Sequence, residues 1–242
     1  MKIGILIPCT SNRREYKSIV QTDLYEYFFK SFFTTYSDEH EYNIYLGIDN
    51  DDDFYTNPSI QDNIFKFVGI MKNCEVEFNY FDPNMYKGKP CWIWNELYKK
   101  AITDECDYFV QCGSDISFID KGWVNNAIKR LKDKDDIGVV GLVDAGRKKF
   151  NPNDTLLTQT MVSKKHYDIF GFYFPLMLPS WSSDNWIGDI YDLEGKKIII
   201  GHRLYNCGGD PRYDVPSDHR KNYYIAMKKY INNIKNFISP EN

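Results

Sequence analysis

Residues 90–115, PCWIWNELYKKAITDECDYFVQCGSD, decide the fold class. Pro90–Ile102 is typical of a helix, because proline is favoured at the first helical position and the apolar residues that follow fall on one face. Tyr108–Cys112 is a short apolar run and predicts a buried strand. The strand ends in the polar triplet Gly113–Asp115. A helix that leads into a buried strand is the repeating unit of an α/β sheet.

The same alternation extends toward the amino terminus. We expect strands at Lys2–Pro8, Tyr42–Asp49 and Cys74–Phe81, and helices at Lys17–Tyr36 and Pro58–Met71. Regular alternation of this kind predicts a Rossmann-like α/β fold, with a mostly parallel twisted sheet and flanking helices.

The pattern loosens after residue 115. We expect further helices at Trp123–Lys132, Ser183–Tyr191 and Ser217–Ile238, and strands at Ile137–Val143, Leu157–Val162 and Lys197–His202. No repeat, low-complexity segment or linker divides the chain. The sequence therefore predicts a single domain over residues 1–242, with the main sheet in 1–144 and a dependent second half in 145–242.

The composition is that of a folded protein. Of the 242 residues, 43% are hydrophobic and 17% aromatic, which rules out intrinsic disorder. The formal charge of −4 argues against nucleic acid as a partner. No apolar run reaches the ~18–20 residues of a membrane span, and the run Ile3–Ile7 is too short for a signal peptide. We therefore expect a soluble, cytoplasmic protein, whose six cysteines, with no CxxC pair, are buried thiols.

Polar side chains follow each of the first four expected strands. Ligands of open α/β sheets bind at the carboxyl ends of the strands, so these side chains should converge on one edge. The candidate ligand-binding residues there are Thr10, Asn12, Arg13, Asp49, Lys89, Ser114 and Asp115. Two of these strand ends are acidic and two are basic, which suits an anionic ligand together with a divalent cation.

Asp115 and Asp49 are the acidic candidates. Asp115 directly follows a buried strand, so it is a stiffly held ligand for a cation that bridges phosphate oxygens, or alternatively a helix or turn cap. Asp49 can accept hydrogen bonds from a ribose or a base edge. We interpret the neighbouring Asp51–Asp53 as a solvated acidic turn.

The loop Lys87–Pro90 precedes the helix at Pro90. Backbone N–H groups and the helix dipole attract phosphate there, and Gly88 permits close approach of the backbone. Asn95, one turn into the helix, is placed to orient this loop. The alternative is a flexible loop with solvated lysines.

The second half contains a candidate general base in the segment Trp181–Trp186 (WSSDNW). Asp184 stands at the start of an expected helix between two tryptophans. Trp181 can stack on a sugar ring, and aromatic surroundings raise the pKa of a carboxylate toward a useful value. The alternative is that Ser183 or Asp184 only caps the helix.

His202 ends the last expected strand and precedes Arg203. A neutral imidazole there can complete a metal site or bind pyrophosphate, whereas the alternative is an ordinary histidine at a sheet edge. His219 is the rival candidate. We expect His40 and His166 at the surface.

The GxSxG, P-loop, HExxH and GxGxxG motifs are absent from the sequence. Their absence argues against the enzyme classes that depend on them, including Rossmann oxidoreductases.

In the order of its elements the chain resembles the GT-A superfamily of nucleotide-sugar-dependent glycosyltransferases. The resemblance covers most of the chain and is carried by Pro8–Arg13 (PCTSNR), Asp49, Gly113–Asp115, Asp184 and His202. Residues 171–186 (GFYFPLMLPSWSSDNW) are also similar to glycosyltransferase-like proteins of large DNA viruses and microbes.

The resemblance implies a cofactor, Mn²⁺ or Mg²⁺. The metal motif of the family is Asp-x-Asp, and in this chain Gly113 replaces the first acid. Of this motif, only Asp115 carries over to the metal-binding role. The resemblance implies His202 as the family's further metal contact. Asp49 or a water would have to substitute for the missing acid.

The resemblance also implies the reaction, in which a sugar passes from a nucleotide-diphosphate sugar to a hydroxyl of a glycan or another acceptor. UDP-sugar is the default donor. Residues 1–144 then form the nucleotide-binding half and 145–242 the acceptor-binding half. Asp184 deprotonates the acceptor, which implies inversion. The residues expected to contact the donor are Thr10, Asn12, Arg13, Asp49, Lys89, Asn95, Ser114, Trp181 and Arg203.

Three alternatives remain open. A retaining enzyme would use Asp184 only as an acceptor contact. A sugar nucleotidyltransferase would share the sheet, but no Gly-rich basic loop follows the first strand. A non-catalytic nucleotide-sugar or glycan-binding domain is favoured by Gly113 and disfavoured by the candidate base.

Overall fold

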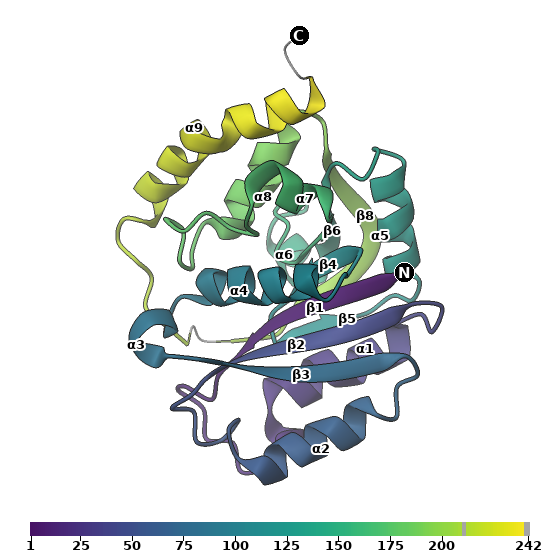
Figure 1. Cartoon of the computed structure of the whole chain (residues 1–242), viewed down its shortest axis with the longest axis vertical. Helices are drawn as coiled ribbons and strands as arrows, with labels where there is room; N and C mark the ends of the chain where they lie inside the picture. Colours follow the sequence, from purple (N-terminus) through teal and green to yellow (C-terminus); the bar gives the residue numbers. More distant parts are fainter. Residues whose placement is uncertain (210–211, 240–242) are drawn as a thin grey trace.

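The computed structural model describes residues 1–209 and 212–239, which form a twisted eight-stranded sheet with helices on both faces (Figure 1). The strands, in order across the sheet, are β3 (Cys74–Phe81), β2 (Glu41–Asp49), β1 (Lys2–Cys9), β4 (Tyr108–Gln111), β7 (Thr160–Ser163), β6 (Val139–Asp144), β8 (Lys197–Asn206) and β5 (Ile116–Phe118). β7 and β5 run antiparallel to their neighbours, and the other neighbouring strands are parallel. The predicted mostly parallel α/β sheet is confirmed.

The carboxyl ends of β1, β2 and β3 lie level at one edge. Cys9 pairs with Ile48 in the β1–β2 register, and Asp49 pairs with Phe81 in the β2–β3 register. The loops that follow these strands therefore meet at this edge, as expected for a ligand site of an α/β sheet.

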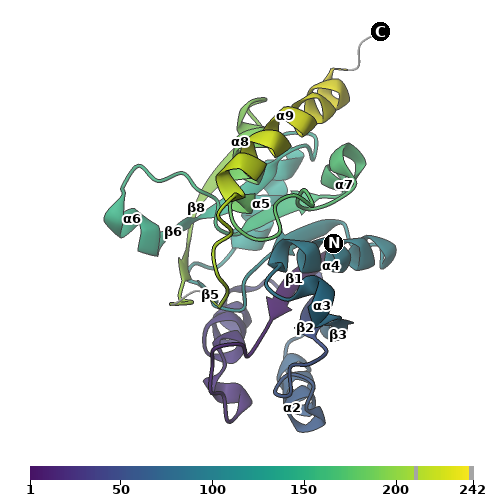
Figure 2. The same ribbon diagram turned by 90° about the vertical axis from the view of Figure 1, so that its left-hand side faces the viewer.

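Helices cover the two faces of the sheet (Figures 1 and 2). One face carries α1 (Lys30–Thr35), α2 (Pro58–Val68) and α5 (Trp123–Lys132), and the other carries α4 (Pro90–Thr103), α7 (Lys165–Phe170), α8 (Ser183–Asp192) and α9 (His219–Ile238). The short helix α3 (Pro83–Tyr86) begins one residue after β3, and α6 (Ala145–Phe150) directly follows β6. Each face has its own buried hydrophobic cluster, and both clusters include residues from 1–144 and from 145–242.

The contact between α4 and β2 is very close at Gly47. A Cβ atom on Gly47 would lie 2.3 Å from Ile93 Cγ2. Glycine is therefore required here by the approach of the helix to the strand. This contact fixes the distance between α4 and the sheet. The first turn of α4 borders the candidate site.

The expected helix Lys17–Tyr36 is wrong as one continuous helix. Thr22 has an extended backbone, and its Oγ1 donates to the carbonyl of Ile19 (2.6 Å) and accepts from the N–H of Tyr25 (3.1 Å). These bonds end one helical turn and start the next. The segment consists of the 3-10 helix η1 (Ile19–Gln21), the π-helix η2 (Leu24–Phe29) and α1.

All six cysteines are free thiols. Four of them are buried: Cys9, Cys91, Cys106 and Cys112. Cys74 and Cys207 are partly exposed. No helix within residues 1–209 and 212–239 is both long and apolar enough to cross a membrane.

Candidate functional site

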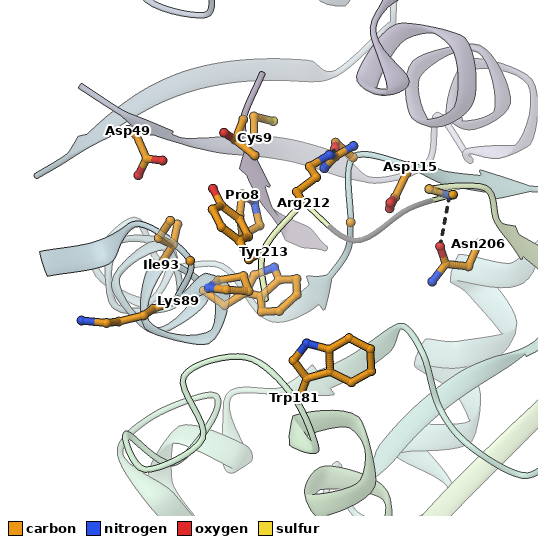
Figure 3. A pocket seen from close by; sticks show the side chains of 18 residues that line it. Pro8, Cys9, Asp49, Lys89, Ile93, Asp115, Trp181, Asn206, Arg212 and Tyr213 are labelled. Carbon is orange, nitrogen blue, oxygen red and sulfur yellow. Dashed lines mark hydrogen bonds between the residues drawn. The ribbon is translucent and has the colours of Figure 1, made fainter. Parts of the chain in front are cut away.

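Two adjoining cavities open at the carboxyl edge of the sheet, beside the first turn of α4. The first, of about 300 Å³, lies over the ends of β1 and β4 (Figure 3). The second, of about 630 Å³, lies over the ends of β4 and β6 and beside the first turn of α8. The residues that line both are Pro90, Trp94, Gly113, Asp115, Trp181, Asn206 and Gly209. A ligand with two parts can therefore extend from one cavity into the other.

Thr10 and Asp49 lie at one end of the first cavity and also line a third hollow of about 320 Å³. Asp49 is 3% exposed. Burial, together with the neighbouring Asp51 carboxylate, raises the pKa of Asp49 to about 6, while the nearby Lys87 ammonium group opposes this rise. Tyr213 lines the same cavity beside Thr10 and Asp49. This end of the cavity presents hydrogen-bonding groups to a polar ring or sugar.

The turn after β1 holds the segment that follows β8. Asn12 Nδ2 donates to the carbonyl of Arg212 (2.7 Å), and Arg13 forms an ion pair with Asp214 (3.1 Å). Of the donor contacts expected in this turn, Thr10 lines the first cavity and Asn12 borders the third hollow. Asn12 and Arg13 thus position the returning segment.

Asp52 is buried, contrary to the expected solvated turn. It is 8% exposed and accepts hydrogen bonds from the N–H and hydroxyl of Ser11 (2.6 and 2.9 Å). It also accepts from the N–H groups of Phe54 and Tyr55 (3.2 and 3.0 Å). Because it satisfies four donors, Asp52 ties the turns after β1 and β2 together.

Asp115 borders both cavities from the loop between β4 and β5. It is half-buried, and burial raises the pKa of its carboxyl, while Arg212 opposes this rise. A Cβ atom on Gly113 would lie 2.5 Å from Asp115 Oδ1, and one on Gly208 would lie 1.9 Å from Oδ2. The position of the missing first acid therefore has no room for a side chain unless Asp115 moves.

The residues around Asp115 do not assemble the expected Mn²⁺ or Mg²⁺ site, because Gly113 replaces the first acid and His202 lies beside Asn126 instead. A divalent ion on a diphosphate is usually held by one or two protein carboxylates, with phosphate oxygens and water as its other ligands. In the described parts of the chain, no group of three or more His, Cys, Asp or Glu side chains is placed to hold a metal ion. The nearby cationic group of Arg212 also opposes a second cation electrostatically.

His202 and Arg203 lie away from the two cavities, because β8 continues to Asn206 and does not end at His202. Four residues of strand, about 13 Å, separate His202 from Asn206. His202 Nδ1 lies 3.4 Å from Asn126 Nδ2. Arg203 forms an ion pair with Asp120 (2.8 Å). The structure therefore does not bring the expected histidine to Asp115 or the expected arginine to the donor cavity.

The loop before α4 is less open to phosphate than expected. Lys89 lines the first cavity, but its ammonium group donates to the carbonyl of Met85 (2.7 Å) and its side chain points away from Asp115 (Figure 3). Pro90 has no N–H, and the N–H of Cys91 donates to the carbonyl of Pro179 (3.0 Å). The first N–H group of the helix is thus already bonded.

Asn95 and His166 are buried in the core, which differs from the positions expected for them. Asn95 is 2% exposed, accepts from the N–H groups of Tyr173 and Phe174 (3.0 and 2.8 Å) and donates to the Phe174 carbonyl (2.8 Å). It orients that loop and not Lys87–Pro90. His166 is bonded to the Tyr191 hydroxyl (2.8 Å) and the Tyr173 carbonyl (3.0 Å), and burial lowers its pKa to about 4. The expected surface position of His166 is wrong.

Asp184 lies in the first turn of α8 and lines the second cavity. Its Oδ1 accepts from the N–H of Asn185 (2.9 Å), and burial raises the pKa of the carboxyl. Ser182 occupies the N-cap position, so neither Ser183 nor Asp184 is the cap. Trp181, 43% exposed, lines both cavities (Figure 3). A partly desolvated carboxylate beside an aromatic wall has the chemistry of a general base.

Comparison with known proteins identifies structural neighbours but no sequence relatives. No protein-family model and no curated protein matches the chain. Crystal structures of S. aureus TarS residues 1–349 match it in complex with UDP-GlcNAc (TM-score 0.58, 18% identity, 93% of this chain, 65% of TarS 1–349) and with UDP (0.57, 17%, 95%, 65%). TarS is a GT-A-type glycosyltransferase. The chain has a GT-A-type fold.

A structure of TarS that is not restricted to residues 1–349 also matches, at a TM-score of 0.56 and 15% identity over 95% of this chain and 39% of that one. The chain therefore spans less than two thirds of the TarS chains that it matches. The likeness establishes the GT-A-type fold, and the chemistry must be argued from the residues of this chain.

Four residues of the GT-A-type edge were not expected from the sequence: Asp144, Asn206, Arg212 and Tyr213. Asp144 ends β6 and accepts from the N–H groups of Gly146 and Arg147 (3.0 and 3.2 Å). Its place after an apolar strand was a usable signal. Arg212 and Tyr213 follow no periodic segment, so only the tertiary structure shows their role.

Proposed function

We propose that this protein is a glycosyltransferase that moves a sugar from a nucleotide-diphosphate sugar, with UDP as the nucleotide, to an acceptor hydroxyl. The observation that carries the proposal is the pair of adjoining cavities at the carboxyl edge of a GT-A-type sheet, with Asp115 and Trp181 shared and Asp184 in the second cavity. The TarS complexes with UDP and UDP-GlcNAc support a uridine nucleotide as donor.

In this proposal the first cavity takes the donor. The nucleoside binds at the end formed by Thr10 and Asp49. Asp49 Oδ1 is buried and has no hydrogen-bond partner among residues 1–209 and 212–239, which supports a ligand donor there. The diphosphate lies along Ser114 and Asp115, so that the sugar reaches Trp181 at the boundary between the cavities.

The second cavity takes the acceptor. Asp184 accepts the proton of the acceptor hydroxyl while the oxygen forms a bond to the anomeric carbon of the sugar. The bond from that carbon to the diphosphate oxygen breaks, and the electron pair leaves with the nucleoside diphosphate. A single displacement of this kind inverts the configuration. The raised pKa of Asp184 supports its role as the base.

A non-catalytic nucleotide-sugar-binding domain is the second candidate. Gly113 in place of the first acid of the metal motif favours it. It predicts donor binding without release of nucleoside diphosphate.

A panel of nucleotide sugars tests the proposed donor. Isothermal titration with UDP-, GDP- and other nucleotide-diphosphate sugars should show binding of a UDP-sugar, and free UDP should compete with it, since both occupy the end at Asp49. Binding of GDP-sugars alone would correct the nucleotide. If no member of the panel binds, the proposed function fails.

The affinity for a UDP-sugar should depend on pH through Asp49. The carboxylate is the better acceptor for nucleoside N–H and O–H groups, and it is protonated below its pKa of about 6. The affinity should therefore fall about tenfold between pH 7 and pH 5. The diphosphate diester of the sugar nucleotide does not titrate in this range. Asp49→Asn should bind more weakly at pH 7 and show a flat profile, and an unchanged pH slope in this variant would exclude Asp49.

A further inference from the structure

Arg212 lies where the expected metal site would be. The segment after β8 turns back over the edge of the sheet and brings the Arg212 side chain beside Asp115 (Figure 3). Arg212 Nη1 donates to Ser114 Oγ (3.1 Å), and Nη2 forms an ion pair with Asp23. The Arg212 side chain is 14% exposed. It is thus a cation fixed at the wall of the first cavity.

One nitrogen of this guanidinium is buried without an acceptor in the described part of the chain. Arg212 Nε is buried and has no hydrogen-bond acceptor within residues 1–209 and 212–239. A buried N–H of a charged group is costly to leave unbonded. Because Arg212 lines the first cavity, a small shift of its side chain would let an acceptor on a ligand bond to Nε. The guanidinium plane presents donors in a fork that matches phosphate oxygens. The ligand chemistry that this site accepts is therefore an anionic, phosphate-like group.

The surrounding charges agree with this assignment. Asp23 and Asp115 face the two guanidinium groups of Arg212 and Arg14, with Arg14 Nε 3.7 Å from Asp23 Oδ2. The Asp23 and Asp115 carboxylates therefore already have fixed cations beside them. Gly113 adds no further carboxylate that a divalent ion would need.

We propose that Arg212 takes the place of the divalent cation: it binds the diphosphate of the donor and neutralises the charge that develops on the departing nucleoside diphosphate. The inference rests on the proposed function. As the bond between the anomeric carbon and the diphosphate oxygen breaks, the electron pair goes to that oxygen, which the guanidinium faces. The guanidinium remains protonated throughout, and the acceptor proton goes to Asp184. Transfer then requires no bound metal ion.

The test is UDP binding by calorimetry, in EDTA and in Mn²⁺. Wild type should bind UDP with the same affinity in both buffers. Arg212→Gln should bind UDP about ten- to hundredfold more weakly, the range expected for lost charge-assisted hydrogen bonds. Its affinity for uridine, which has no phosphate, should equal that of wild type. A purely structural role of Arg212 would weaken both ligands together.

Arg130→Gln, on the exposed face of α5, is the matched control and should bind UDP as wild type does. Arg212→Lys keeps the charge for Asp23 and should fold if the glutamine variant does not; it should still bind UDP more weakly, because lysine lacks the fork. UDP binding that requires Mn²⁺, or unchanged UDP affinity of both Arg212 variants, would overturn the inference and leave the proposed function standing. Absence of all nucleotide binding by wild type would overturn the proposed function itself.

Discussion

Asp184→Asn should lower the rate of sugar transfer by ~10²–10⁴-fold, the usual contribution of a positioned general base. The amide has the size of the carboxylate but cannot accept the acceptor proton. Asp184 lines the second cavity and not the first, so the affinity for the donor should remain that of wild type. The measurement is the initial rate of nucleoside diphosphate release with saturating donor, together with donor affinity by calorimetry.

Asp192→Asn provides the control, because Asp192 is an exposed residue at the other end of the same helix. It should transfer sugar as fast as wild type. Normal transfer by Asp184→Asn would exclude Asp184 as the base. A retained configuration in the product would assign Asp184 to acceptor binding only.

Gly47→Ala should destabilise the fold by about 1–3 kcal/mol, the cost of one extra carbon in a tightly packed core. The new Cβ would lie 2.3 Å from Ile93 Cγ2 and 3.2 Å from the Phe81 ring, so α4 must move away from β2. Urea unfolding should show a lower midpoint. Since α4 borders the first cavity, donor affinity should fall as well.

Gly201→Ala is the matched variant, because nothing lies within 4 Å of a Cβ at that position in β8. Its unfolding midpoint should be close to that of wild type. A midpoint of Gly47→Ala equal to that of Gly201→Ala would show that the close contact between α4 and β2 does not limit stability.

The sheet was predictable because its strands and helices have local signatures. The helix Pro90–Ile102 and the strand Tyr108–Cys112 agree with α4 and β4 to within a residue or two, since the helix has a periodic apolar face and the strand is a short apolar run. The end of β8 was not predictable. The pairing of β8 with β6 continues past a register shift between Leu142 and Val143, and the last residues of β8 pair with β5. Both pairings are long-range properties, and they move the strand end from His202 to Asn206.

The lining of the two cavities was predictable where a side chain closely follows a strand or begins a helix. Thr10, Asp49, Asp115 and Asp184 meet this description, and each borders one of the cavities. Arg212 does not, because the turn after β1 and Asp23 hold it from distant parts of the chain. A charge supplied by tertiary structure leaves no pattern in the neighbouring sequence.

The most direct test of the central claim is the release of nucleoside diphosphate from the UDP-sugar that binds, followed by chromatography over time. Wild type should release UDP slowly to water, and faster when a panel of glycan acceptors is added. Asp184→Asn should bind the same donor and release UDP ~10²–10⁴-fold more slowly. Tight binding of the donor by wild type, with no release of UDP under any of these conditions, would contradict the transferase and identify a binding domain.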